Sequence, residues 1–157
     1  MKMRHQPLLS FVTPFFAILF SGLALIGCGS SGAAAPSPVV TRTAILSGAQ
    51  ESPTPVYSGA TGTGFVTVDP TTRAITGTVT FSGFTATAAH IHVAPAGSAP
   101  ANNIVFGLTL GANSATVPSG IILTEAQYAD LLAGNWYFNV HSAANPAGEI
   151  RGQINKL

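Results

Sequence analysis

The stretch Arg73–Phe81, RAITGTVTF, alternates between threonine and apolar residues or glycine from Ile75 onward. Side chains two residues apart share one face of a β-strand. We therefore predict a half-buried strand whose inward set is Ile75, Gly77, Val79 and Phe81 and whose outward set is Thr76, Thr78 and Thr80. Asp69-Pro70-Thr71-Thr72 precedes it and is typical of a hairpin turn, which would join it to a strand at Phe65–Asp69.

The same texture continues along the chain as short runs of Thr, Val, Ile, Gly and Ala separated by turn residues, which favours one antiparallel all-β domain. We expect an antiparallel β-sandwich or barrel with one short helix. Further strands are predicted near Thr43–Ser47, Ala88–Val93, Asn103–Leu110, Ala115–Pro118, Asn135–His141 and Glu149–Ile154. The glycine-rich run Gly59–Gly64 lacks the lysine of a phosphate loop and is interpreted as a turn.

LTEAQYADLLAGN, residues 123–135, predicts the helix. Thr124 is placed as the N-cap with Gln127 three residues later, the spacing of a capping box, and Gly134 ends the helix. The expected packing stripe is Tyr128, Leu131 and Leu132.

The amino-terminal residues are typical of an export signal: Lys2 and Arg4 precede a largely apolar run, Leu8–Ile26, that leads into LIGC, residues 25–28. These four residues resemble the lipobox of bacterial lipoproteins, which implies that residues 1–27 are a signal peptide and that Cys28 carries the lipid. Two acyl chains anchor a protein stably to a membrane. The alternatives are a transmembrane helix, which its internal proline and glycines disfavour, and an ordinary buried thiol at Cys28.

We accordingly expect residues 28–38 to be a lipidated cysteine with a flexible linker and residues 39–157 to form the domain. The protein would then lie in the cell envelope outside the cytoplasm. The residue after the cysteine is Gly29 and not an aspartate, which favours the outer membrane in a cell that has one.

Charge and composition narrow the functions. Without Lys2 and Arg4, four basic residues face five acidic ones, so no strong field would gather nucleic acid. The single cysteine is assigned to the anchor, and both methionines lie in the signal, so the domain has no disulfide, thiolate nucleophile or soft ligand for Cu⁺. No GxSxG elbow or carboxylate pair indicates hydrolysis, and we assign no catalytic residue.

AAHIHVA, residues 88–94, carries two histidines on one strand face, about 6.6–6.8 Å apart along the backbone. His90 and His92 could converge on one ion, and His141 is the candidate third ligand because NWYFNVH places it opposite the apolar face. Neutral imidazoles suit Cu²⁺ or Zn²⁺. The alternative is that all three histidines are simply solvated on a polar sheet face, which Glu149 and Arg151 share.

Five blocks of the chain resemble the CHRD domain, a family named for its occurrence in chordin. They are AILSGAQESPTPV (44–56), TGTGFVTVD (61–69), AAHIHVAPAG (88–97), LTEAQYADLLAGNWYFNVHS (123–142) and NPAGEIRGQI (145–154). The resemblance implies an immunoglobulin-like β-fold and no particular activity.

AHIHVA (89–94), YFNVHSAANPAG (137–148) and GEIRGQI (148–154) are in addition similar to segments of copper–zinc superoxide dismutases. This similarity implies a superoxide-dismutase-like β-sandwich or barrel. It also implies that His90, His92 and His141 match copper ligands and that Arg151 matches the arginine that guides the anion. The bridging histidine, the zinc loop and the disulfide of those enzymes have no counterpart here.

Three functions stay open. The first is a non-enzymatic binding or structural module of the envelope, whose protein or small-molecule partner is unknown. The second is an envelope protein that binds Cu²⁺ or Zn²⁺, or a degenerate relative of superoxide dismutase, using the three histidines. The third is true dismutase activity, in which Arg151 would steer the anion.

Overall fold

The computed structural model describes residues 38–98 and 103–155. Cys28, the expected signal peptide and almost all of the expected linker lie outside the described residues, so these assignments remain expectations. Within the described ranges, no helix has the length and apolar character needed to cross a membrane.

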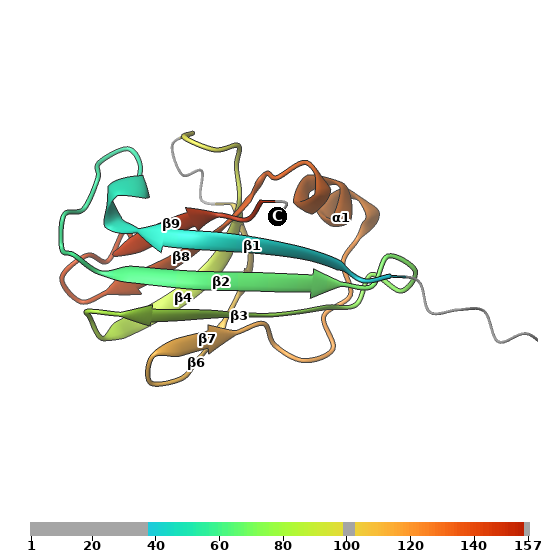
Figure 1. Ribbon diagram of the computed structural model, residues 1–157, viewed down its shortest axis with the longest axis horizontal. Helices are drawn as coiled ribbons and strands as arrows, with labels where there is room; N and C mark the ends of the chain where they lie inside the picture. The colour runs from blue at the N-terminus through green and yellow to red at the C-terminus, as the bar shows by residue number, and fades with distance from the viewer. Residues whose placement is uncertain (1–37, 99–102, 156–157) are drawn as a thin grey trace, which may run out of the picture. The chain divides into compact units, whose positions relative to one another are not determined.

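The described residues form nine strands and one α-helix. Figure 1 shows how these elements are arranged. The strands are β1 Val40–Ser47, β2 Thr61–Val68, β3 Ile75–Ser82, β4 Ala86–Val93, β5 Ile104–Gly107, β6 Thr109–Leu110, β7 Ser114–Thr116, β8 Trp136–Ser142 and β9 Ile150–Gln153. A 3₁₀ turn, Gly48–Gln50, follows β1, and the helix α1, Glu125–Leu132, precedes β8.

The strands make one antiparallel sheet in the order β5-β4-β8-β9-β1-β2-β3-β7-β6. Its two end strands are consecutive in the chain, with only Leu108 between them; β5 pairs with β4, and β6 pairs with β7. The chain therefore bends at Leu108 and nearly closes the sheet into a barrel. This confirms the expected all-β antiparallel class with one short helix, and it divides the single strand predicted at Asn103–Leu110 into two.

The core lies inside the curved sheet and follows the predicted alternation of β3. Ile75, Val79 and Phe81 are buried, as is Gly77, and Thr76 and Thr80 are exposed. The other large buried side chains include Leu46, Val66, Val68, Ile91, Leu123, Leu131, Trp136, Phe138, Val140, Ile150 and Ile154.

The interpretation of Gly59–Gly64 as a turn was wrong for its last four residues, because Thr61–Gly64 begins β2. Two of its glycines, Gly62 and Gly64, allow neighbouring groups to approach the strand closely. A Cβ on Gly64 would stand 2.7 Å from the Phe138 ring, and one on Gly62 would stand 2.8 Å from the Thr80 carbonyl oxygen. Glycine is common in strands where another group approaches closely, and that use resembles a loop in composition.

The helix begins as predicted. The Thr124 hydroxyl accepts from the Gln127 amide at 3.2 Å, and the Gln127 side-chain oxygen accepts from the Thr124 amide at 2.9 Å, which forms the capping box. Leu131 is fully buried, and Tyr128 packs against the core. Leu132, predicted in the packing stripe, is 42% exposed, so the stripe is narrower than expected.

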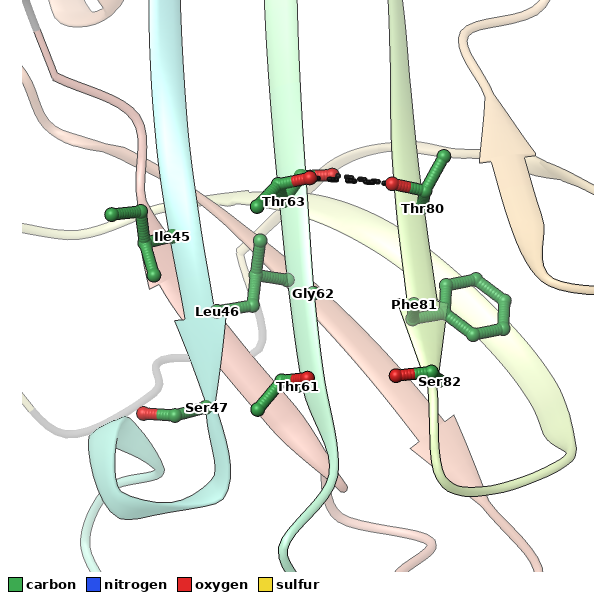
Figure 2. A pocket seen from close by; sticks show the side chains of 9 residues that line it. All are labelled: Ile45, Leu46, Ser47, Thr61, Gly62, Thr63, Thr80, Phe81 and Ser82. Carbon is green, nitrogen blue, oxygen red and sulfur yellow. Dashed lines mark hydrogen bonds between the residues drawn. The ribbon is translucent and has the colours of Figure 1, made fainter.

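The outer face of β1, β2 and β3 carries a groove with uncharged walls (Figure 2). Thr63 on β2 and Thr80 on β3 join their hydroxyls across it at 3.3 Å. The groove is lined by Ile45, Leu46, Ser47, Thr61, Gly62, Thr63, Thr80, Phe81 and Ser82, none of which ionises near neutral pH. The histidines and the buried charged side chains lie elsewhere, on β4, β8 and β9 and on the segments next to β1 and β9.

We predict that Gly64→Ala destabilises the domain by about 1–3 kcal/mol, because the new methyl group overlaps the Phe138 ring inside the barrel. Gly107→Ala is the matched control, since its Cβ makes only an ordinary 3.8 Å contact with His90. Denaturant unfolding of both variants measures the difference, and equal midpoints would show that Gly64 is not required for this packing.

Candidate metal centre

Pairing of β4 with β8 sets the three histidines on one face of the sheet. His90 lies opposite Asn139, His92 lies opposite Tyr137, and His141 lies opposite Ala88, so His141 is a diagonal neighbour of His90. Diagonal neighbours are within reach of long side chains. The strands carrying the predicted ligands are thus adjacent.

The structure brings the three predicted histidines together. One ligand nitrogen from each lies within 4.8 Å of the other two. The ring centroids of His90 and His141 are 4.9 Å apart, those of His90 and His92 are 5.5 Å apart, and those of His92 and His141 are 6.5 Å apart. The cluster joins two strands that are separated by about 50 residues in sequence.

Hydrogen bonds fix how His141 is oriented. Its Nδ1 lies 3.0 Å from the Pro146 carbonyl oxygen, which can only accept, so Nδ1 carries the proton. Its Nε2 then carries a lone pair, which accepts a hydrogen bond from the Nδ1–H of His90 at 3.0 Å. Without metal, this bond between two imidazoles holds the rings side by side with a nitrogen of His141 ready to bind.

His92 is the most buried of the three, at 6% exposure. Its ring stacks on Tyr137, with centroids 5.0 Å apart and planes 9° from parallel. Neither ring nitrogen has a hydrogen-bond partner in the described part of the chain. A buried polar atom without a partner costs about 1–3 kcal/mol, and a metal ion bound at one of these nitrogens would supply the missing interaction.

The surroundings also keep the histidines neutral. Burial lowers the pKa of His90 and of His141, and for His141 the neighbouring His90 adds to this while the Pro146 carbonyl opposes it. Burial, followed by the charges of His90, His141 and Arg151, lowers the pKa of His92 to about 4. All three rings therefore offer lone pairs at neutral pH.

The alternative of a solvated polar face does not hold for the residues around the histidines. Tyr137, Asn139, Glu149 and Arg151 are all buried, although they alternate with the core residues of β8 and β9. The segments that follow β1 and β4 fold over the face: Glu51 accepts from the Asn139 side chain at 2.6 Å, and the Ser98 carbonyl accepts from Arg151 at 3.1 Å. Alternation alone cannot show which polar face a loop will cover.

Arg151, matched in sequence to an anion-guiding arginine, is enclosed. Its guanidinium carbon lies 3.8 Å from the centre of the Tyr137 ring, and Tyr137 stacks on His92. Because β8 lies between β4 and β9, Tyr137 separates Arg151 from His92. Arg151 therefore packs on Tyr137, which in turn supports the ring of His92.

Glu51 is a residue of this region that the sequence did not reveal. Burial raises its pKa to about 7, against the opposing effects of the Asn139 hydrogen bond and the Arg151 charge. Its partner Asn139 is 88 residues away in sequence. The run ESPTP at residues 51–55 carries no spacing or motif that indicates this contact.

The fold and the cluster define a class, an antiparallel β-barrel domain with three histidines gathered on a covered polar face. The model of the CHRD domain matches residues 42–154, within the expected domain of residues 39–157, and the chain belongs to that family. Comparisons with curated proteins and with solved structures give no significant match. Family membership agrees with the resemblance of the five sequence blocks.

The raised pKa of Glu51 predicts that the stability of the domain depends on pH. Its pKa rises from 4.5 in the unfolded chain to about 7 in the fold, so the unfolded state loses its proton first as pH rises. The contribution of Glu51 to stability is therefore complete below about pH 4.5 and is lost as pH rises through 7. Because the side chain is partly exposed, we expect a loss of about 1–2 kcal/mol relative to Glu51→Gln, whose side chain stays neutral.

Urea unfolding of the wild type and Glu51→Gln at several pH values between 4 and 8 measures this difference. Glu125→Gln, on the exposed start of α1, is the control and should follow the wild type. Parallel curves for the wild type and Glu51→Gln would contradict the assignment.

Proposed function

We propose that this CHRD domain is a non-enzymatic module that binds one Cu²⁺ or Zn²⁺ ion through His90, His92 and His141. The observation that supports it is the convergence of three imidazole nitrogens within 4.8 Å, one of them on a buried ring without a hydrogen-bond partner in the described residues. On a solvated strand face, the nitrogens of that ring would instead be exposed to water and form hydrogen bonds with it.

The donor set fits these ions. Imidazole nitrogens bind Zn²⁺ at about 2.0–2.1 Å, which puts two ligands of a tetrahedral ion about 3.3 Å apart. The facing nitrogens of His90 and His141, 3.0 Å apart, are already near that separation, and an ion would replace the hydrogen bond between them. Neutral nitrogen ligands favour Zn²⁺ and Cu²⁺ over Ca²⁺ and Mg²⁺, which prefer oxygen. A bound ion would retain Lewis acidity at any position that protein ligands leave open.

Supporting contacts lie behind two of the three ligands. The Pro146 carbonyl accepts from His141, and Tyr137, itself covered by Arg151, supports the ring of His92. Such outer contacts orient metal ligands and affect affinity. The cluster is in this respect organised for binding before any ion arrives.

The similarity to copper–zinc superoxide dismutases agrees with a copper-type ligand set at these positions. It does not extend to a two-metal enzyme, because His90, His92 and His141 are the only histidines after the expected signal peptide and none is left to bridge two metals. Arg151 is enclosed beneath Ser98 and Tyr137 rather than open to an incoming anion. We therefore favour metal binding over dismutation.

The proposal also includes a location, the outer surface of a cell membrane, through lipid on Cys28. Its support is the LIGC motif with the basic and apolar residues before it. A domain held there by residues 28–38 would meet metal ions, proteins and small molecules outside the cytoplasm.

We predict that the domain, residues 39–157, binds Cu²⁺ or Zn²⁺ with a Kd tighter than about 10 µM, equivalent to roughly 7 kcal/mol. Each of His90→Ala, His92→Ala and His141→Ala should weaken binding at least about tenfold, because each removes one of three ligands. Calorimetric titration measures the affinity, and Glu125→Gln is a control far from any imidazole in sequence. Affinities that do not change in the histidine variants would refute the site.

Lipid attachment is tested separately in cells. The full-length protein should fractionate with membranes and partition into detergent, whereas Cys28→Ser should be released or retain its signal peptide, because serine cannot form the thioether to lipid. Mass spectrometry of the amino-terminal peptide checks the modification. An unmodified Cys28 in the mature protein would rule out the anchor.

A further inference from the structure

Glu149, the residue directly before β9, has a carboxylate side chain and is only 2% exposed. Its Oε2 accepts from the Ser142 hydroxyl at 2.7 Å and from the Asn145 side-chain amide at 2.6 Å. Burial alone would raise the pKa of Glu149, but hydrogen bonds from Ser58, Asn145 and Ser142 lower it. Hydrogen bonds thus stabilise the charge of Glu149. Among the contacts of the described residues, none pairs this carboxylate with a lysine or an arginine.

These hydrogen bonds close the turn between β8 and β9. The Ser142 hydroxyl also accepts from the Asn145 backbone amide at 2.9 Å, and the Asn145 carbonyl accepts from the Gly148 amide at 3.1 Å. The Glu149 amide donates to the Val140 carbonyl at 2.7 Å, which joins the two ends of the turn. Backbone hydrogen bonds and the Ser142 hydroxyl thus close residues 143–148, and the Glu149 carboxylate fixes the two side chains, Ser142 and Asn145, at the base of this turn.

Pro146 lies in that turn, and its carbonyl is the group that binds the Nδ1–H of His141. From this geometry we infer that Glu149 is the positioning residue of the histidine cluster. Through Ser142 and Asn145 it holds the turn so that Pro146 selects the Nδ1–H tautomer of His141 and leaves Nε2 for the ion. The inference rests on the proposed function for its purpose, but the tautomer can be measured without metal.

The test compares Glu149→Ala with Glu149→Gln, which keeps an acceptor oxygen for Ser142 and Asn145. In the metal-free protein, ¹⁵N NMR of the imidazoles should show the Nδ1–H tautomer for His141 in the wild type and in Glu149→Gln. Glu149→Ala should show a mixture of tautomers. Glu125→Ala, which removes an exposed carboxylate on α1, should match the wild type.

Zinc titration gives the second measurement. Glu149→Ala should weaken Zn²⁺ binding about 10- to 100-fold, as loss of an outer-shell contact commonly does, and Glu149→Gln should recover most of that loss. A Glu149→Ala protein that keeps the wild-type tautomer of His141 overturns the inference. Failure of the wild type to bind Zn²⁺ or Cu²⁺ overturns the proposed function instead and leaves the tautomer result to decide the role of Glu149.

If Glu149→Ala does not fold, Asn145→Ala replaces it. This change removes one of the side-chain donors to the carboxylate while leaving the backbone hydrogen bonds of Asn145. A mixed tautomer at His141 in Asn145→Ala supports the inference, and an unchanged tautomer overturns it.

Discussion

The register between β4 and β8 is the constraint on which the histidine cluster depends. His90 opposite Asn139 places His141 one diagonal step away, on the same face of the sheet. A slip of one residue would turn every side chain of one strand to the opposite face and put His141 among the core residues. Irregular pairing between Ala86 and Ala88 occurs beside His141, where the end of the ladder adjusts to the following turn.

A second irregularity lies on the other side of β4, where its pairing with β5 shifts between Ile91 and His92. Bulges bend a strand and change the direction of a side chain. Here the consecutive residues Ile91 and His92 are both buried, one in the core and the other beneath the covering segments. The extra residue at this shift is Val105 on β5, so β4 keeps its regular alternation, and stacking on Tyr137 supports the ring of His92 at the inner side of the cluster.

Burial of so many polar groups on one face needs compensation. Glu51 with Asn139, and Glu149 with Ser142 and Asn145, are paired at 2.6–2.7 Å. Within the described ranges, the buried side-chain atoms that lack a partner are His92 Nδ1 and Nε2, Trp136 Nε1, Tyr137 Oη and Arg151 Nη2. All except Trp136 Nε1 belong to the polar face of β4, β8 and β9, so the unsatisfied atoms gather beside the three imidazoles.

Local pattern was sufficient to predict much of the fold. Period-two alternation identified β3 and the inward residues of β8, and the spacing of Thr124 and Gln127 located the start of α1. The three histidines were found because two of them share a strand face and the third ends a clearly alternating strand. The covering segments were not predictable, because contacts such as Glu51 with Asn139 join residues 88 positions apart and leave no periodic trace.

Barrel closure has a consequence for crowded surroundings. Unpaired strand edges are templates on which other chains can extend a sheet. The two terminal strands of this sheet, β5 and β6, have four and two residues and are joined through Leu108, so little backbone is left unpaired in the described ladder. Many copies packed side by side would have scarcely any edge from which to nucleate a shared cross-β aggregate.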